Sequence, residues 1–562
     1  MSDDISTRHY APRRLPQRVH ARPIPWVPGE MLVSVLADVS GDSPPDSVVA
    51  VIGKVVAEIL GDVQIDTPPR DPPLLIPTLK GDDQLFFAPV RLGSHEPRAM
   101  RDAISRLNSS DGRRRFEGAG LQPVAATPNW FGAAQNCDGG SPASLPVPVD
   151  PYGGRIRYAP QFEALDVAED AEDSAWAETG SGDDRLHVAV LDTSPTREDL
   201  AWAHQRFPQN RHLGELLSRL VTGSGSLQLD AALERAVADL EHNGGFRPIE
   251  PAEAYDVRDH GLFVASVVHA TAPWARIRLV RVLNNFGVGS LHALVIALTA
   301  LIQSKRSDEP LVINLSLGML PPLEQLRDIW FGFAIDGLPG CPEDRDLQFL
   351  PGGRPLSRAD LHQLIAQKDP AVTVNLDLLH EPLRQLMATL LAHNCLVVAA
   401  AGNDSVYRGV QRHPRWGPRL PALYDQVLGV AADTVRPGSP ARYSNRGEVL
   451  AAPARDAVAT LGGDLAADGL SPSGGVIGVY SAEQFPPFLP PAVPALNETG
   501  WAEWAGTSFA TPIMAGVAAN FWATHPDAAR PTLDEINTLV HSHPNVADLG
   551  VPGVPTRLTW LP

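Results

Sequence analysis

Short apolar runs alternate with helical segments in the sequence from Arg185 onward. Strands that are apolar on both faces are typical of a parallel sheet buried between layers of helices. Residues 291–303 and 383–393 read as candidate covering helices. We therefore expect an α/β fold in which helices cover a parallel sheet. The runs that predict its strands are Leu186–Leu191, Ile277–Val282, Leu311–Leu315, Leu396–Ala400 and Val427–Val430.

A second, smaller unit is predicted over residues 29–130. Its apolar residues follow the order strand, helix, strand, helix, strand, which indicates a compact α+β unit. Pro89 lies inside the second strand and indicates a sheet edge, because proline cannot donate to a sheet ladder. The expected strands are Glu30–Leu36, Leu85–Leu92 and Leu121–Trp130, and the expected helices are Asp46–Leu60 and Pro97–Leu107.

The segments on either side of this unit differ from it in composition. Residues 1–28 are rich in proline and arginine, which favours a disordered, solvated tail over a basic targeting tail. Between Glu163 and Asp184 there are nine acidic residues and no lysine or arginine. Because such a stretch buries little apolar surface, residues 131–184 are predicted to be an acidic linker.

Charge and composition exclude several classes of function. The formal net charge of -19 argues against general binding of nucleic acid or of anionic membranes. Three cysteines over 562 residues do not make a disulfide framework. No apolar stretch reaches the roughly 18 residues that a bilayer span needs, and no signal-peptide run opens the chain. These features predict a soluble cytoplasmic protein without nucleic-acid or membrane partners.

One block of the sequence places a serine, Ser508, at the first turn of an apolar helix; it reads Gly506-Thr-Ser-Phe-Ala-Thr-Pro512. A serine hydroxyl is a weak nucleophile at neutral pH and needs a base, an acid that orients the base, and oxyanion donors. Candidates for all three lie upstream. Asp192 ends an apolar strand, His260 opens a helix, and Asn403 follows another buried strand.

The chain order Asp192, His260, Asn403, Ser508, with the blocks around these residues, resembles the subtilisin-like serine peptidases (subtilases). The resemblance covers the chain from about Arg185 to its C-terminus. It implies the subtilisin-like form of the parallel sheet, with helices on both faces. Two further blocks resemble the family's substrate-binding segments, and the residues they contribute are Gly287, Gly289, Ser316, Leu317 and Gly318.

The resemblance implies a serine endopeptidase that hydrolyses protein or peptide substrates through an acyl-enzyme. Ser508 would be the nucleophile, His260 the general base, and Asp192 the group that orients His260. The Asn403 side chain and the Ser508 N–H would donate to the oxyanion. Each residue alone has a plainer reading: a helix-capping serine, a structural histidine, a turn-capping aspartate and a turn asparagine.

Residues 29–130 are similar to the inhibitory prodomain of subtilases, and Ala126-Thr-Pro-Asn129 resembles the end of that prodomain. This implies a precursor that is inhibited by its own N-terminal region; an unrelated interaction domain is the alternative. Members of the family often bind calcium. No calcium-ligand loop can be matched in this sequence, so no metal ligands are predicted.

Residues 185–562 would form the catalytic domain, and three stretches exceed what a subtilase core needs. These insertions lie near 195–255, 319–390 and 460–503, and the first contains helical segments near 213–220 and 229–240. Long insertions usually fall in surface loops and often shape access to a site.

Two departures from the family pattern flank the proposed site. Thr193-Ser194-Pro195 follows the acid where the family usually has Thr-Gly, and Leu262 stands where the family usually has threonine. A residue before proline is pushed toward extended geometry, so the turn after Asp192 must differ. These departures support the rival function, a catalytically silent, subtilase-like peptide-binding module.

Overall fold

The computed structural model describes most of the chain outside its N-terminal tail, the acidic segment and several loops. The described residues are 26–38, 45–61, 65–66, 74–77, 83–133, 143–149, 186–221, 227–242, 256–305, 309–320, 326, 330, 376–407, 410–411, 417–435, 440–445, 455–486, 494–524 and 556–560.

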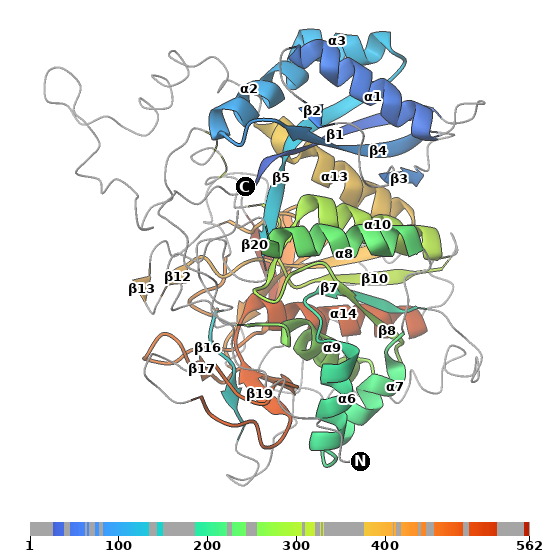
Figure 1. Cartoon of the computed structure of the whole chain (residues 1–562). Helices are drawn as coiled ribbons and strands as arrows, with labels where there is room; N and C mark the ends of the chain where they lie inside the picture. Colours follow the sequence, from blue (N-terminus) through green and yellow to red (C-terminus); the bar gives the residue numbers. More distant parts are fainter. Residues whose placement is uncertain are drawn as a thin grey trace, which may run out of the picture.

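The larger sheet has seven strands in the order β20-β15-β14-β11-β10-β7-β8. Figure 1 labels β20, β10, β7 and β8 of this sheet. Six of them run parallel, and β20, at one edge, is antiparallel to β15. The expected parallel sheet is therefore present, and each of the five apolar runs forms one of its strands. The strands are β7 (Val188–Asp192), β8 (Ile277–Arg281), β10 (Leu311–Leu315), β11 (Cys395–Ala400), β14 (Val427–Asp433), β15 (Arg455–Leu461) and β20 (Thr556–Trp560).

Helices cover both faces of this sheet. Val188 and Val190 of β7 belong to one core with α9 and α14, whereas Ala189 and Leu191 belong to a second core with α10 and α13. Neighbouring strand residues point to opposite faces, so each strand has to be apolar along its whole length. The helices are α8 (Leu227–His242), which packs on α10, α9 (His260–Thr271), α10 (Leu291–Ser304), α13 (Asp377–Ala392) and α14 (Thr507–Thr524).

The N-terminal unit is an antiparallel sheet with helices on one face. Its strands lie in the order β2-β4-β1-β5, with β3 also paired to β4, and α1, α2 and α3 cover the outer face (Figure 1). The inner face packs on α10 and α13, and one continuous apolar core joins the unit to them. The elements are β1 (Trp26–Asp38), α1 (Pro45–Leu60), β2 (Ile65–Asp66), β3 (Leu74–Pro77), β4 (Asp83–Leu92), α2 (Pro97–Asn108), α3 (Ser110–Gly118) and β5 (Gln122–Ala133).

Strands β1 and β4 differ from the sequence-based expectation, and β2, β3 and α3 were not predicted. Strand β1 begins at Trp26, inside the stretch assigned to the tail, because the Trp26 ring is buried edge-on against Trp130 at 5.5 Å between centroids. Strand β4 is not an edge, since it lies between β1 and the pair β2 and β3. Pro89 is tolerated there because it falls between the residues that pair with β3 and those that pair with β2.

The segment predicted as a linker is partly built into the fold. Phe131–Ala133 extend β5 and pair antiparallel with β9 (Val288–Ser290). Residues 143–149 include β6 (Val147–Pro148), which pairs with β19 (Trp501–Trp504). These residues are uncharged, unlike the acidic stretch that begins at Glu163. The acidic stretch and residues 1–25 lie outside the described residues.

The insertions carry elements of their own. The first contains α6 (Arg197–Arg206), α7 (Arg211–Arg219) and α8, and so includes both expected helical segments. The third contains β16 (Asp464–Leu465), β17 (Pro472–Ser473), β18 (Val476–Val479) and β19. Most of the second lies outside the described residues. None of the described helices combines the length and the apolar composition of a bilayer-spanning segment.

Candidate active site

The carboxylate of Asp192 and the imidazole of His260 meet in the interior. Asp192 is the last residue of β7 and His260 the first of α9, and both are fully buried. His260 Nδ1 lies 2.7 Å from Asp192 Oδ1, which also accepts from the Thr193 N–H at 2.6 Å. A carboxylate can only accept at this position, so Nδ1 carries the proton and Nε2 presents a lone pair when the ring is neutral.

Close approach of the helix to the strand requires a glycine at position 261. A Cβ there would lie 2.1 Å from the Thr193 carbonyl oxygen and 2.9 Å from Asp192 Cβ. Thr193 also reaches across this contact, because its Oγ1 accepts from the Gly261 N–H at 3.0 Å and donates to the Arg258 carbonyl at 2.9 Å. The departure at Thr193-Ser194-Pro195 therefore leaves a threonine that connects the two elements.

Aromatic rings enclose the His260 imidazole. Trp504 meets it edge-on at 5.5 Å between centroids, and Phe509 lies at 5.3 Å. Both rings contact Phe263, one turn along α9. Because these side chains exclude water, hydrogen bonds inside the site act in a low local dielectric.

Ser508 lies in the first turn of α14 with its side chain buried. Its Oγ donates to the Ser316 carbonyl at 3.1 Å, and Ser316 Oγ donates to the Ser508 carbonyl at 2.7 Å. His260 Nε2 is buried and has no hydrogen-bond partner among the described residues. The nucleophile candidate and the base candidate are thus brought to one site without a direct hydrogen bond. Phe509, the next residue, touches the His260 ring.

The Asn403 amide is fixed by Thr507, the residue before Ser508. Asn403 Oδ1 accepts from the Thr507 N–H at 3.0 Å and from Thr507 Oγ1 at 2.9 Å. These two contacts place the Asn403 amide beside the start of α14. Asn403 is 6% exposed.

The end of β5, from the N-terminal unit, contacts both segments expected to bind substrate. Gly132 pairs with Gly289. A Cβ on Gly132 would lie 2.2 Å from Met319 Sδ and 3.5 Å from the Gly318 carbonyl oxygen. Gly287 adopts a φ of 72° in the turn before β9.

A family model described as the subtilase family matches residues 183–557, which is two thirds of the chain. The chain belongs to the subtilase family. It is therefore a subtilisin-like serine peptidase, in agreement with the resemblance found in the sequence. No curated protein sequence was found to match it.

Among solved structures, similar ones include the epidermin leader peptide processing serine protease EpiP from Staphylococcus aureus. That match has 16% identity and a TM-score of 0.42, and covers 92% of this chain and 92% of the other. A lanthipeptide protease matches with 17% identity and a TM-score of 0.37, covering 72% and 92%. The patellamide maturation protease PatA matches with 18% identity and a TM-score of 0.32, covering 64% and 86%.

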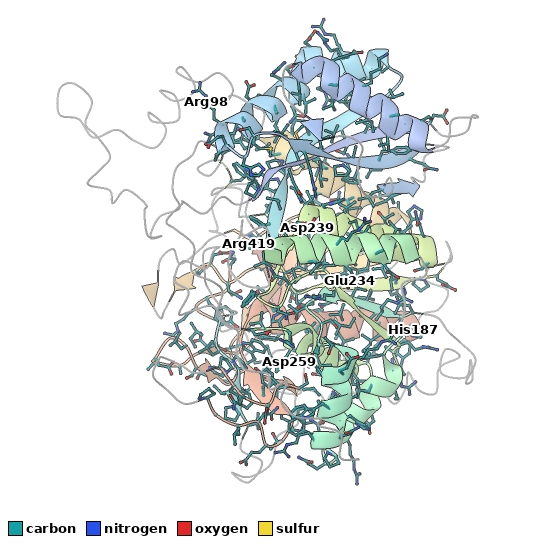
Figure 2. The ribbon with its side chains drawn as sticks, in the orientation of Figure 1. Arg98, His187, Glu234, Asp239, Asp259 and Arg419 are labelled. Atoms are coloured by element: carbon teal, nitrogen blue, oxygen red, sulfur yellow. The ribbon has the colours of Figure 1, made fainter. Side chains whose placement is uncertain are left out.

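In this subtilase a buried ion pair, not expected from the sequence, connects the Asn403 loop to the chain at Gly318 (Figure 2 labels Arg419). Arg419 Nε donates to the Asp404 carboxylate at 2.8 Å, and both side chains are under 10% exposed. Asn445 Nδ2 donates to the same carboxylate at 2.5 Å. The Arg419 stem also packs on Gly318, where a Cβ would lie 2.5 Å from Arg419 Cδ. The position of Asp404 next to Asn403 is the sequence signal that could have drawn attention to it.

A second carboxylate adjoins the catalytic candidate in this subtilase. Asp259 precedes His260 and is 1% exposed (Figure 2). It accepts from the Ser481 N–H at 3.1 Å, from the Ala482 N–H at 2.9 Å and from Ser481 Oγ. Burial raises the pKa of Asp259 to about 6, although the hydrogen bonds from Ser481 oppose the shift. The carboxylate anchors the start of α9 to the third insertion.

Proposed function

We propose that this subtilase is an active serine endopeptidase that uses Asp192, His260 and Ser508. The observation that carries the proposal is the buried 2.7 Å contact between His260 Nδ1 and Asp192 Oδ1 beside the first turn of the Ser508 helix. The remaining ring nitrogen, Nε2, has a lone pair and no partner among the described residues, as a general base requires.

In the proposed reaction, Ser508 Oγ attacks the scissile carbonyl carbon while its proton passes to His260 Nε2. The tetrahedral intermediate then expels the amine, which takes that proton from Nε2 and leaves an acyl-enzyme. Water, with His260 again as base, hydrolyses the ester and restores Ser508. Asp192 holds the imidazole orientation and stabilises its charged form throughout.

Substrate binding would bring Ser508 to His260. A peptide that adds as a strand along Ser316–Gly318 donates its N–H groups to main-chain carbonyls. The Ser316 carbonyl now accepts from Ser508 Oγ, so a peptide N–H would compete for it. Rotation about the Ser508 Cα–Cβ bond would then direct the hydroxyl toward Nε2. Catalytic hydrogen bonds often tighten only once substrate is bound.

The oxyanion would be held by the Asn403 amide nitrogen and the Ser508 N–H. The contacts from Thr507 hold the Asn403 amide in one orientation. The Ser508 N–H is in the first turn of α14, where backbone donors have no partner within the helix and the helix dipole favours negative charge.

The N-terminal unit would act as an intramolecular inhibitor. Its last strand pairs with β9 in register Phe131 to Ser290, Gly132 to Gly289 and Ala133 to Val288. The chain then continues at Ser144, whose N–H donates to the Ala505 carbonyl at 3.2 Å, three residues before Ser508. A chain held on both sides of the nucleophile in this way would block substrate until it is cut.

A fluorophosphonate probe separates the enzyme from the rival, a silent peptide-binding module. The full chain should become labelled on Ser508, faster after incubation that allows the N-terminal region to be cut. The Ser508→Ala chain should stay unlabelled. Ser110→Ala, which changes an exposed serine of α3, should label like wild type. Absence of label from the cut wild-type chain would favour the binding module.

A further inference from the structure

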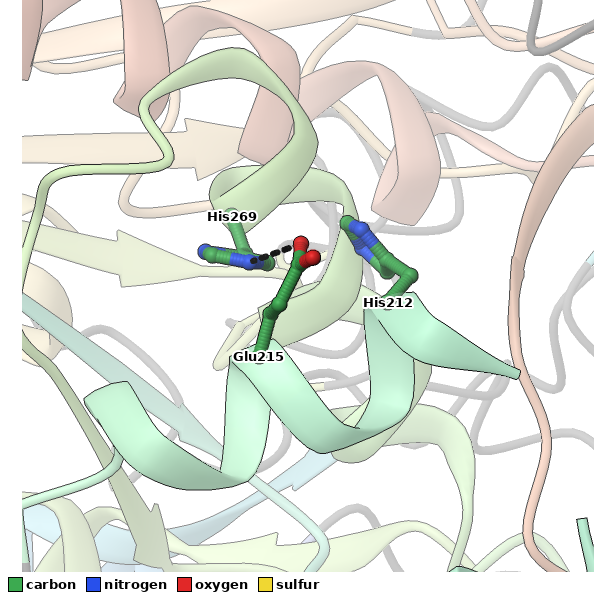
Figure 3. Close-up of side chains that lie close together, drawn as sticks. All are labelled: His212, Glu215 and His269. Carbon is green, nitrogen blue, oxygen red and sulfur yellow. Dashed lines mark ion pairs between the residues drawn. The ribbon is translucent and has the colours of Figure 1, made fainter. Parts of the chain in front are cut away.

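A group of three potential metal ligands lies outside the catalytic site, between α7 and α9 (Figure 3). His212 and Glu215 are three residues apart on α7 and so share one face of that helix. His269 belongs to the last turn of α9. One ligand atom from each residue lies within 4.8 Å of the other two.

The buried His269 ring lacks hydrogen-bond partners in the described part of the chain. It is 2% exposed, and neither Nδ1 nor Nε2 has a hydrogen-bond partner within the described part of the chain. A buried polar group without a partner destabilises the fold, so such groups in proteins usually meet a protein group, a water or an ion. Glu215 lies on the Nε2 side, with Oε2 at 3.9 Å.

The His212 ring is held in the state that a metal ligand needs. Its Nε2 lies 2.9 Å from the Ser266 carbonyl, which can only accept, so Nε2 carries the hydrogen and Nδ1 the lone pair. A ligand histidine typically donates its second ring N–H to a carbonyl or carboxylate in this manner. Stacking on Trp501 at 5.5 Å, and the His269 ring at 4.7 Å, fix its orientation.

Both imidazoles are kept neutral. Burial lowers the pKa of His269 to about 3, and the neighbouring His212 and Arg219 add to the shift. Burial also lowers the pKa of His212, against the Ser266 hydrogen bond and the charge of Glu215. Neutral imidazole is the form that binds metal ions, so protons compete little for these ligands near neutral pH.

We propose that His212, Glu215 and His269 form a zinc-binding site that fastens α7 to α9. Two imidazoles and one carboxylate are a ligand set that zinc accepts, with water as a fourth ligand. Calcium prefers an all-oxygen shell and does not suit these residues. Tetrahedral zinc holds its ligand atoms roughly 3.4 Å apart. The Glu215 and His269 atoms are 3.9 Å apart, and all three ligand atoms lie within 4.8 Å of one another, so the group has to contract on binding the ion. The Glu215 side chain is 67% exposed and can move to do this.

The site would act on the helix that carries His260. Metal binding stabilises the folded state by its binding free energy, because the unfolded chain does not assemble the three ligands. The proposal does not depend on catalysis, since all three residues lie away from Asp192, His260 and Ser508. The zinc-site proposal would stand even if the proposed enzyme function proved wrong.

The test uses the full chain without an affinity tag, carrying Ser508→Ala to prevent self-cleavage, stripped with a chelator and titrated with zinc chloride. One equivalent of zinc should bind with a Kd at or below about 1 μM, and the melting temperature should rise. Cobalt in place of zinc should give the visible bands of a tetrahedral site. Calcium chloride should produce neither effect.

Three variants locate the site. Glu215→Gln, on the exposed side of α7, should weaken zinc binding at least tenfold and leave the unloaded melting temperature unchanged. Glu198→Gln, an equally exposed change on α6, is the matched control and should bind zinc normally. His269→Leu removes the buried ring nitrogens with little change in volume, and its melting temperature should not respond to zinc. A chain that takes up no zinc, or a Glu215→Gln chain that binds it undiminished, would overturn the proposal.

Discussion

At the scale of single residues, the candidate site depends on side chains whose partners are fixed by the backbone around them. The hydrogen bond from His260 to Asp192 leaves Nε2 as the basic atom, and Thr507 holds the Asn403 amide. The sequence offered Asp192, His260, Asn403 and Ser508 as candidates, from their places at strand ends and helix starts and from the order that resembles the subtilases. It could not predict the contacts of Arg419 or of Asp259, because their partners lie far away in the sequence.

Asn403→Ala should lower kcat by about 100- to 1000-fold with little change in KM, because it removes one oxyanion donor and leaves the triad intact. This magnitude is the one established for the loss of the oxyanion-hole asparagine in subtilisin itself. Steady-state kinetics on a peptide substrate measure it. An effect on KM alone would make Asn403 a binding or turn residue.

The buried carboxyl of Asp259 predicts that the stability of the fold depends on pH. Its pKa rises from the ordinary 3.8 to about 6 on folding, so the folded state favours the protonated form. The stability that this group contributes is complete below pH 4 and is lost as the pH rises through about 6. A shift of this size corresponds to about 3 kcal/mol.

The unfolding free energy of Asp259→Asn should therefore increase relative to that of wild type as the pH rises from 4 to 7. Asparagine has no ionised form to desolvate and keeps an oxygen that can accept from Ser481. Chemical unfolding at a series of pH values gives the comparison. A difference in unfolding free energy that stays constant over this range would show that Asp259 titrates like an exposed carboxyl.

At the scale of elements, the site depends on how closely α9 approaches β7. The Cβ of Gly261→Ala would collide with the Thr193 carbonyl and displace the start of α9 from Asp192. We expect kcat to fall by about 100-fold, because displacements near 1 Å in a catalytic group can have this effect. Gly53→Ala in α1 is the control, since a Cβ there meets nothing within 4 Å. If Gly261→Ala had the same kcat as the control, close approach of α9 to β7 would not be needed for catalysis.

The elements themselves were largely accessible from the sequence. Apolar runs predicted five of the parallel strands, and helical periodicity predicted α1, α2, α7, α8, α10 and α13. Short strands such as β2, β3 and β6 were missed, because two to four residues carry no period. The prediction that the strand containing Pro89 lies at a sheet edge was wrong. Strands β2 and β3 both pair with this strand, and their pairing ends on either side of Pro89.

At the scale of the whole molecule, the N-terminal unit and the peptidase domain share one core. The inner face of the N-terminal sheet packs on α10 and α13, Thr127 Oγ1 donates to the Leu379 carbonyl at 2.6 Å, and Asn129 Oδ1 accepts from the His292 N–H at 2.9 Å. Docking of this kind was not predictable from composition. A complementary interface leaves no periodic signal beyond that of each element.

The chain should cut itself between Ala133 and Ala143. The described residues before and after this stretch are held beside β9 and beside Ala505, so a cut between them would separate the inhibiting strand from the catalytic domain. N-terminal sequencing after incubation should find a new terminus within residues 134–143 in wild type and none in Ser508→Ala. A cut confined to residues 150–185 would identify the acidic stretch as the processing site instead.

The proposed function requires Ser508 to be the nucleophile of a peptidase, and hydrolysis of a peptide library by purified wild type and Ser508→Ala is the direct test. After the N-terminal region is cut, wild type should hydrolyse peptides. Ser508→Ala, cut at the same place by an added protease, should fall by about a million-fold, to background, with an unchanged melting temperature. The size of this loss is again the value established for subtilisin. Hydrolysis by Ser508→Ala at the wild-type rate, or none by the cut wild type, would contradict the account.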